Sequence, residues 1–276
     1  MHLICAEDRE GHTRQNGGQN AYLHACTLIG RSRSGLTEAR DMLLRLRPGL
    51  GEARMRSQIN QQLWTCEKSL GEHQGFFSQS GQDAWLEANV FRGKRGGIFV
   101  EIGGYDGVTG SNCLFFEALR GWDGLLIEPS PALHAEAAKS RRCPCFRIAL
   151  TSSDGEADFV DVQEGLTQMG GLRETMTSGA LAAIASNPNT KSAVIKVPTR
   201  TLAGVLNDNA MTQVDYISLD VEGGELSVLA GFPFDKITVT AWTIENSHNG
   251  REINELMAAK GYRLAEVLGD DLVFVR

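Results

Sequence analysis

The sequence FVEIGGYDG, residues 99–107, decides the fold class. It begins as a short apolar run and ends in a glycine-rich turn, and Ser111-Asn112 then open a stretch of helical character. A buried strand that ends in glycines lets the backbone approach a ligand closely, and a helix N-terminus beyond it favours groups that accept hydrogen bonds. Together, the strand, the turn and the helix predict a nucleotide-type binding site.

The same alternation continues after Gly96-Gly97, where short apolar runs follow helical stretches in the manner of βα units that build a parallel sheet. We expect strands at 98–102, 124–128, 145–150, 214–220, 238–245 and 271–275, and helices at 111–119, 131–139, 202–207, 225–229 and 251–260. Residues 157–197 are rich in Gly, Ser and Thr, so we expect a hairpin at 157–162 followed by a loop that covers the active site. The pattern predicts a single α/β domain.

Carboxylates follow two of the predicted strands. Glu128-Pro129 ends the second strand, about twenty residues beyond the glycine turn, where α/β cofactor folds place an acid that binds ribose hydroxyls. The strand at 214–220 ends in Asp220, and Glu222 and Glu225 follow it closely. Because the carboxyl ends of strands line the ligand crevice, we expect Asp220 and its neighbours to face the ligand. For Glu225 the alternative is that it merely begins the next helix, where an acid interacts favourably with the helix dipole.

A further polar group follows the strand at 238–245. Glu245, Asn246 and His248 place an acid, an amide and an imidazole at the same edge of the sheet. Histidine accepts protons near neutral pH, so His248 is a candidate catalytic base, and the alternative is a loop histidine without a catalytic role.

Composition restricts the classes of partner. The chain has 34 Asp and Glu against 27 Lys and Arg, a formal charge of -7, which argues against a dedicated nucleic-acid binder. No apolar run is long enough for a membrane helix, so we expect a cytoplasmic protein that makes no membrane contact and keeps its six cysteines reduced.

The N-terminal third differs in texture from the rest. Residues 1–35 lack apolar periodicity and predict a flexible tail, whereas 36–75 predict two amphipathic helices ahead of a main domain at 76–276. Seven Arg against three acids between Arg31 and Arg56 give this segment a local charge of +4. The excess is either a solvated helix face or a contact for an acidic partner, substrate or subunit, and the helices are candidates for homo-oligomer contacts.

Four linked motifs in this order and spacing resemble the FkbM family of S-adenosylmethionine (SAM)-dependent methyltransferases. They are SQSGQD at 78–83, VEIGGYDG at 100–107 with Ser111-Asn112, GWDGLLIEP at 121–129 and SLDVEGGE at 218–225. The resemblance extends from about residue 78 to the C-terminus. Gly104, where Ala is common in such turns, departs from the pattern.

The resemblance implies a Rossmann-like class I methyltransferase, with a mostly parallel seven-stranded sheet flanked by helices. It implies SAM over Glu101, Gly103 and Asp106, with its ribose on Glu128 and its adenine near Ala149 and Leu150. The remaining residues of the implied cofactor site are Tyr105, Ser111, Asn112, Pro129, Asp220 and Glu222. Most members of the family are assigned to O-methylation in natural-product or glycan pathways, so the expected acceptor is a hydroxyl on a small molecule or glycan.

Methyl transfer from a sulfonium is an in-line displacement, so the protein chiefly aligns the reactants and removes the acceptor proton. His248 or Asp220 would take that proton. Asp220, Glu245 and Asn246 also look like the ligands of the magnesium-dependent catechol O-methyltransferases, although a metal-free reaction is the default expectation. The rival hypotheses are an NAD(P)-dependent oxidoreductase, disfavoured because Tyr105 replaces the second glycine of G-x-G-x-x-G, and a non-catalytic assembly protein with this fold.

Overall fold

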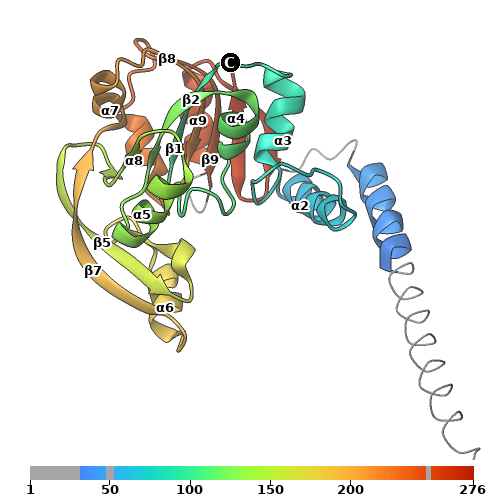
Figure 1. The fold of residues 1–276 in the computed structure, drawn as a ribbon, viewed down its shortest axis with the longest axis horizontal. Coiled ribbons are helices and arrows are strands. Elements are labelled where there is room, and N and C mark those ends of the chain that lie inside the picture. The colour runs from blue at the N-terminus through green and yellow to red at the C-terminus, as the bar shows by residue number, and fades with distance from the viewer. Residues whose placement is uncertain (1–31, 48–52, 247–249) are drawn as a thin grey trace, which may run out of the picture.

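The chain forms an α/β fold around a mixed sheet, seen here in a computed structural model that describes residues 32–47, 53–246 and 250–276 (Figure 1). In these residues the main sheet has the order β10-β11-β9-β8-β1-β2-β3. Five strands run parallel: β1 (Ile98–Ile102), β2 (Asp123–Ile127), β3 (Cys145–Phe146), β8 (Gln213–Leu219) and β9 (Thr238–Glu245). The hairpin of β10 (Arg263–Leu268) and β11 (Asp271–Val275) adds antiparallel strands at the edge. The predicted α/β class is confirmed, and the sheet is mixed.

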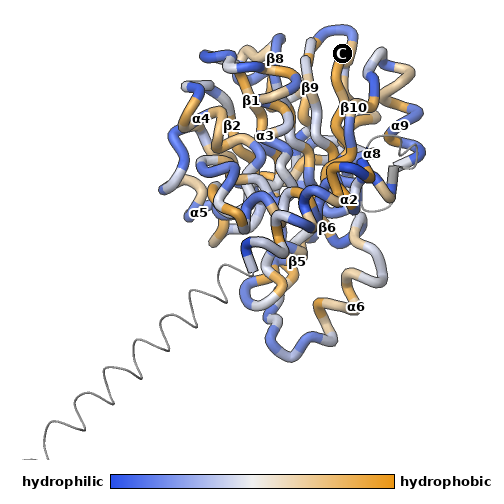
Figure 2. The backbone as a smooth tube through the Cα atoms, turned by 90° about the vertical axis from the view of Figure 1, so that its right-hand side faces the viewer, coloured by the Kyte–Doolittle hydropathy of each residue, from blue (hydrophilic) through white to orange (hydrophobic). Residues whose placement is uncertain are grey.

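Helices cover both faces of this sheet. Successive side chains of a strand point to opposite faces, and here the side chains on both faces are apolar. Phe99 of β1 packs with side chains of α3 (Gln82–Leu86), the π-helix η1 (Glu87–Phe91) and α4 (Leu114–Arg120). Val100 and Ile102 face the opposite side, with α7 (Leu202–Asp208), α8 (Glu225–Ala230) and α9 (Gly250–Ala259). Figure 2 shows apolar strands in the interior of the fold. The sheet is therefore rigidly held, and its strand ends are fixed relative to one another.

A second sheet replaces the covering loop that the sequence predicts. Its order is β4-β7-β5-β6, with β4 (Ala149–Leu150), β5 (Gly155–Glu164), β6 (Gly171–Leu172) and β7 (Lys191–Arg200). A 3-10 turn η2 (Thr167–Met169) and α6 (Ser178–Ser186) lie between its strands, and α6 projects with β5 and β7 from the main body (Figure 1). The predicted loop is wrong because long-range pairing of β5 with β7 orders a segment that has little apolar periodicity.

The predicted strand at 145–150 is also wrong as a single element. It divides into β3, in the main sheet, and β4, in the second sheet, with Arg147 and Ile148 between them. α5 (Pro131–Ser140) lies ahead of β3 in the chain. The chain therefore crosses from one sheet to the other at this point.

The N-terminal helices attach to the outer strand of the main sheet. A helix over residues 32–46 precedes α2 (Ala53–Ser69), and α2 donates hydrogen bonds from Ser57 Oγ to Gly269 O (2.5 Å) and from Asn60 Nδ2 to Val267 O (2.8 Å). These contacts cover an edge that would otherwise expose strand backbone. The predicted tail at 1–35 lies outside the described residues except for 32–35, which are helical.

Three arginines of the basic segment form ion pairs within the chain. Arg47 and Arg56 both contact the buried Glu266 carboxylate of β10, at 3.1 and 3.0 Å. Arg40 Nη1 lies 2.7 Å from Glu72 Oε1. These three arginines thus hold the helices against the body of the same molecule.

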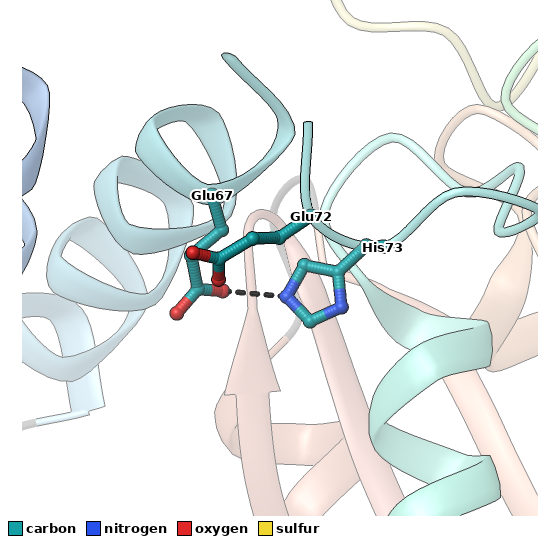
Figure 3. Close-up of side chains that lie close together, drawn as sticks. All are labelled: Glu67, Glu72 and His73. Atoms are coloured by element: carbon teal, nitrogen blue, oxygen red, sulfur yellow. Dashed lines mark hydrogen bonds and ion pairs between the residues drawn. The ribbon is translucent and has the colours of Figure 1, made fainter. Parts of the chain in front are cut away.

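Glu72 belongs to a small cluster at the end of α2 that also contains Glu67 and His73 (Figure 3). His73 Nε2 lies 2.7 Å from Glu67 Oε2, and its ring stacks on Trp64 with centroids 4.8 Å apart. The cluster thereby connects α2 with the chain that leads to α3. Among the helices that the structure describes, none combines the length and the apolar character needed to cross a bilayer.

Candidate functional site

A cavity lies at the carboxyl ends of β1, β2 and β8, where their loops face the second sheet. The main sheet contributes Gly103 and Tyr105 after β1, Glu128 after β2 and Asp220 after β8. The opposite wall comes from the second sheet and its turns, through Ala149, Leu150, Phe159, Asp161, Thr167 and Leu172. The cavity therefore occupies the ligand crevice expected of an open α/β sheet.

The glycines after β1 are required by the protein's own packing. Gly103 has φ +77°, and a Cβ there would lie 2.0 Å from the Asp220 carbonyl oxygen. A Cβ on Gly104 would lie 2.4 Å from Leu126 Cγ of β2, which explains why this chain departs from Ala at that position. The two glycines thus bring the ends of β1, β2 and β8 together, a role different from the close approach to ligand that the sequence suggests.

Tyr105 continues this turn in the left-handed region, with φ +51°. Its backbone N–H donates to Glu128 Oε2 (3.0 Å), and its hydroxyl lies 2.6 Å from Thr167 Oγ1 in the second sheet's turn. Non-glycine residues in this conformation are strained and often mark functional sites. Tyr105 therefore connects the turn, the Glu128 carboxylate and the opposite wall.

Glu128 presents a buried carboxylate to the cavity, with an exposed fraction of 5%. Its two oxygens accept hydrogen bonds from the backbone N–H groups of Tyr105 (3.0 Å) and Ser130 (2.8 Å). Burial raises the pKa of Glu128 to about 7, even though those hydrogen bonds lower it. Each oxygen keeps a lone pair for a further donor, so the group is suited to receive a pair of hydroxyls.

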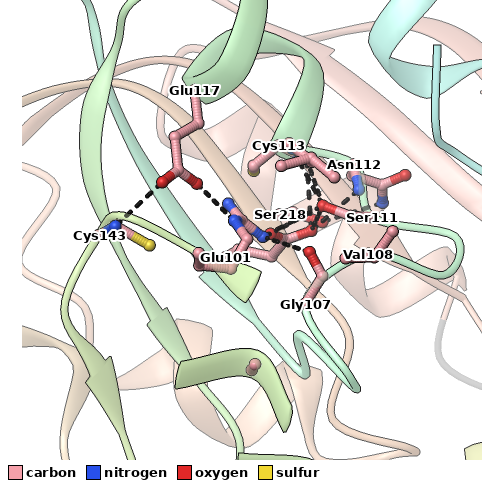
Figure 4. Close-up of polar contacts among 12 residues, drawn as sticks. Glu101, Gly107, Val108, Ser111, Asn112, Cys113, Glu117, Cys143 and Ser218 are labelled. Carbon is pink, nitrogen blue, oxygen red and sulfur yellow. Dashed lines mark hydrogen bonds and ion pairs between the residues drawn. The ribbon is translucent and has the colours of Figure 1, made fainter. Parts of the chain in front are cut away.

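Glu101 lines the same cavity, but its carboxylate is occupied by the protein (Figure 4). Oε1 accepts from Ser111 Oγ (2.7 Å) and from the N–H of Asn112 (2.9 Å), and Oε2 accepts from Arg141 Nη1 (2.5 Å). Arg141 is itself fully buried and also pairs with Glu117. This network holds the loop that contains Ser111 and Asn112 in place. The Glu101 carboxylate therefore stabilises the wall of the site and does not project into the cavity.

The same network corrects the helix predicted to open at Ser111-Asn112. α4 begins at Leu114, whose N–H donates to Ser111 Oγ at 3.0 Å. Ser111 and Asn112 instead form the loop that lines the cavity. The predicted ends of the strands differ less from the observed ends than the predicted start of this helix does. Pairing with neighbouring strands fixes the strand ends, whereas a local side-chain hydrogen bond fixes the start of the helix.

Two predicted site residues lie outside the cavity lining. The Asp106 carboxylate accepts from the N–H groups of Val108 (2.8 Å) and Thr109 (2.7 Å) and closes its own turn. Asn246 does not line the cavity, and its N–H donates to Asp270 O (2.9 Å). The predicted base His248 falls in 247–249, outside the described residues.

Three carboxylates meet where β8 and β9 end. Ligand atoms of Asp220, Glu222 and Glu245 lie within 4.8 Å of one another, so Glu222 takes the place that the sequence assigned to Asn246. Burial, and then repulsion from Glu245 and Glu222, raises the pKa of Asp220 well above its ordinary value. Burial and the Glu245 charge raise the pKa of Glu222 to about 8. Such a cluster keeps protons on some of its carboxyls at neutral pH, and its ionised members attract cations.

Glu225 has a different role from these acids. Its Oε1 accepts from the N–H groups of Val221 (3.0 Å) and Gly223 (3.1 Å), and the residue is buried at the start of α8. The structure therefore favours the alternative in which Glu225 begins the helix.

Sequence reasoning placed Ala149, Leu150 and a covering segment at 157–197 near the site, but it did not single out the β5 and β6 residues that line the cavity. Asp161 of β5 is the clearest omission, since its carboxylate lines the cavity and is only 4% exposed. A single acid in an alternating strand carries no recognisable motif. Only the pairing of β5 with β7, which is not readable locally, brings it to the site.

Comparisons with known proteins identify the family. The model of the methyltransferase FkbM domain matches residues 101–264. No curated protein sequence matches this chain. Among solved structures, the methyltransferase FkbM from Methylobacillus flagellatus KT is 13% identical, with a TM-score of 0.46 over 87% of this chain and 58% of that one. This chain thus spans 58% of that neighbour's length. Because the domain model covers more than half of its residues, the chain belongs to the FkbM methyltransferase family.

Proposed function

We propose that this chain is a SAM-dependent methyltransferase that methylates a hydroxyl group on a small molecule, natural product or sugar. The observation that carries the proposal is the Glu128 carboxylate, buried beside the turn after β1 and open to the cavity. An acid at the end of the second strand, next to a tight turn after the first, is the arrangement that α/β cofactor folds use for ribose. Membership of the FkbM family supports methyl transfer.

The residues of the cavity fit the parts of SAM. Glu128 would accept hydrogen bonds from the ribose hydroxyls, with Pro129 beside it, and Ala149 and Leu150 would contact the adenine. The backbone of Gly103 and Tyr105, together with Ser111 and Asn112, would border the amino-acid portion. When bound, SAM supplies a methyl group on a positively charged sulfur.

The protein's remaining tasks are to align the acceptor and to receive its proton. Asp220 and Glu222 are the candidates, because the member of the pair that is ionised has a raised pKa and is a stronger base than an ordinary carboxylate. The acceptor hydroxyl would lie against this pair, and its proton would pass to a carboxylate oxygen. His248 remains a candidate for the same task.

Magnesium is an alternative partner of the acids. Asp220, Glu222 and Glu245 offer the oxygen ligands that magnesium prefers, and a bound cation would lower the pKa values of these acids. We keep metal-free transfer as the proposal, since carboxylates with raised pKa values can hold the acceptor proton themselves.

The decisive experiment is calorimetric titration of the purified chain with SAM, S-adenosylhomocysteine and NAD in parallel, each in EDTA and in magnesium. We expect saturable binding of both adenosyl ligands in either buffer and none of NAD. Glu128→Ala should bind the adenosyl ligands at least about tenfold more weakly, because buried polar groups of the ligand lose their acceptor. Binding of NAD alone would favour the oxidoreductase hypothesis, and no binding by a folded chain would favour a non-catalytic role.

A further inference from the structure

The helix over residues 32–46 has two long faces with different surroundings. The first face repeats at i, i+4, i+7 and i+11 and is half-buried; its members are Leu36, Arg40, Leu43 and Arg47, the last directly after the helix. Arg40 and Arg47 form the ion pairs with Glu72 and Glu266. The first face therefore attaches the helix to the body of its own chain.

The second face, which we call the outer face, repeats at i, i+3, i+4, i+7, i+10 and i+11. Its members are Gly35, Glu38, Ala39, Met42, Arg45 and Leu46, and all but Ala39 are exposed. The exposed fractions of Met42 and Leu46 are 52% and 58%. Figure 1 shows the helix at the periphery of the molecule, beyond α2 from the main sheet. Two large apolar side chains that adjoin in this position, one turn apart, indicate a docking surface.

The charges of the outer face identify its partner. Glu38 and Arg45 are seven residues apart, so they lie two turns from each other on the same edge of the helix, beside Met42. Among the residues that the structure describes, neither forms an ion pair. If two copies of the helix pack antiparallel about a two-fold axis at residues 41–42, Glu38 of each copy is level with Arg45 of the other. Parallel packing would bring like charges together, so the outer face complements itself only in the antiparallel arrangement.

The small residues of the outer face fit the same alignment. Leu46 of each copy would lie opposite the gap between Gly35 and Ala39 of the other copy, and Met42 of both copies would meet near the axis. A glycine inside a helix costs about 1 kcal/mol relative to alanine. In this chain a Cβ on Gly35 would meet no atom within 4 Å, so packing within the chain does not require the glycine. The close approach of a second helix does require it.

We propose that the outer face binds the outer face of a second copy, so that the chain forms an antiparallel dimer through the helix over residues 32–46. Two Glu38–Arg45 ion pairs would border an apolar centre. An anionic membrane surface is a less suitable partner, because it would repel both Glu38 and the net charge of -7. The interface has one helix per copy and is smaller than a standard one, so we expect a reversible dimer with a dissociation constant on the order of micromolar.

The test is sedimentation equilibrium of the full chain between about 1 and 100 micromolar, where wild type should pass from monomer to dimer. Arg45→Glu should weaken the dimer at least about tenfold, because two attractive pairs become repulsive. The double variant Glu38→Arg/Arg45→Glu exchanges the two charges and should restore the wild-type dissociation constant. Arg33→Glu is the matched control, since this exposed residue lies on the opposite side of the same helix and its reversal should leave the dimer unchanged.

Three outcomes would overturn the inference, with circular dichroism of each variant establishing that its helices are retained. The first is a wild type that stays monomeric at every concentration; sedimentation of that monomer with anionic phospholipid vesicles would then assign the outer face to a membrane surface. The second is a dimer that Arg45→Glu does not weaken, and the third is a double variant that stays as weak as Arg45→Glu. The outer face lies apart from the cavity, so none of these outcomes bears on the proposed methyl transfer.

Discussion

Glu128 combines two features that make its ligand affinity depend on pH. Burial raises its pKa to about 7, and the ionised form is the one that accepts from two donors. A ribose that donates both hydroxyls to Glu128 therefore binds the ionised form better than the protonated form. Binding and deprotonation are thus linked at this residue.

We expect the affinity for S-adenosylhomocysteine to rise with pH and to be about tenfold weaker at pH 6 than at pH 8, because Glu128 must first lose its proton. Glu128→Gln should bind more weakly and show a flatter pH profile. Calorimetric titration at several pH values measures both. Glu136→Gln, an exposed acid of α5 paired with Lys139, serves as the control and should keep the wild-type profile. An equally steep profile in Glu128→Gln would remove this residue from the ribose site.

At the residue scale, sequence alone located the side chains that adjoin a strand end or a glycine turn. Gly103, Glu128 and Asp220 are readable because the ends of parallel strands meet at one edge of a sheet. Asp106 does not line the cavity, because its turn folds the carboxylate back onto its own backbone, and this fold-back is not readable from the motif. The sequence predicts Glu222 in the cofactor site. Its proximity to Glu245 depends on the distance between two loops, which no local sequence pattern encodes.

At the element scale, buried strands were the most predictable part of the fold. β1, β9 and β11 have the predicted bounds, because each is a short run with strongly apolar positions. β10, sequence RLAEVL, was missed because Leu, Ala and Glu are helix formers, and only its pairing with β11 makes it a strand. Most of β7 lies in the Gly-, Ser- and Thr-rich segment where we expect a loop, and its Pro198 also argues against a strand interior.

The attachment of α2 to β10 gives a test of whether the N-terminal helix belongs to the folded unit. Asn60→Ala removes the donor to Val267 O, leaves a buried carbonyl without its partner and should lower the free energy of unfolding by about 1 to 3 kcal/mol. Urea unfolding measures the change. Thr65→Ala is the control, because the exposed Thr65 hydroxyl donates to Gln61 O within α2 itself. An unfolding transition of Asn60→Ala that coincides with those of wild type and Thr65→Ala would show that this hydrogen bond does not stabilise the attachment of α2 to β10.

At the scale of the whole molecule, this acidic chain places buried acids both in the cavity, such as Glu222, and beside it, such as Asp271, which accepts from Asn112 of the lining. The pKa of Glu222 rises from 4.5 to about 8 and that of Asp271 from 3.8 to about 7, in both cases chiefly through burial. At a pH between the unfolded-state and folded-state pKa of each acid, the folded chain keeps a proton that the unfolded chain releases. The contribution of Glu222 and Asp271 to the free energy of unfolding is therefore complete below their unfolded-state pKa values. It is lost as the pH rises through their folded-state pKa values.

We accordingly expect the ligand-free chain to be less stable toward urea at pH 8.5 than at pH 5.5. Glu222→Gln should reduce that difference, because an amide cannot ionise in the cluster. Glu136→Gln again provides the comparison for a change in net charge alone, and should leave the difference as in wild type. Greater stability at pH 8.5 would mean that the acids are held as an ionised, compensated group.

The crossing of the chain from β3 to β4 has a consequence for how the molecule opens. The two sheets are continuous only through Arg147 and Ile148 on that side, yet both form walls of one cavity. A ligand that fills the cavity touches both sheets and binds only when both sheets are formed. Opening either sheet then costs the binding free energy of the ligand in addition to the free energy of opening itself. In hydrogen exchange, saturating S-adenosylhomocysteine should slow the amides of β5 and β7 as well as those of β1, while the helix over residues 32–46 exchanges as before. Protection of the main sheet alone would mean that the sheets open independently; protection of both would make the ligand the element that joins them into one cooperative unit.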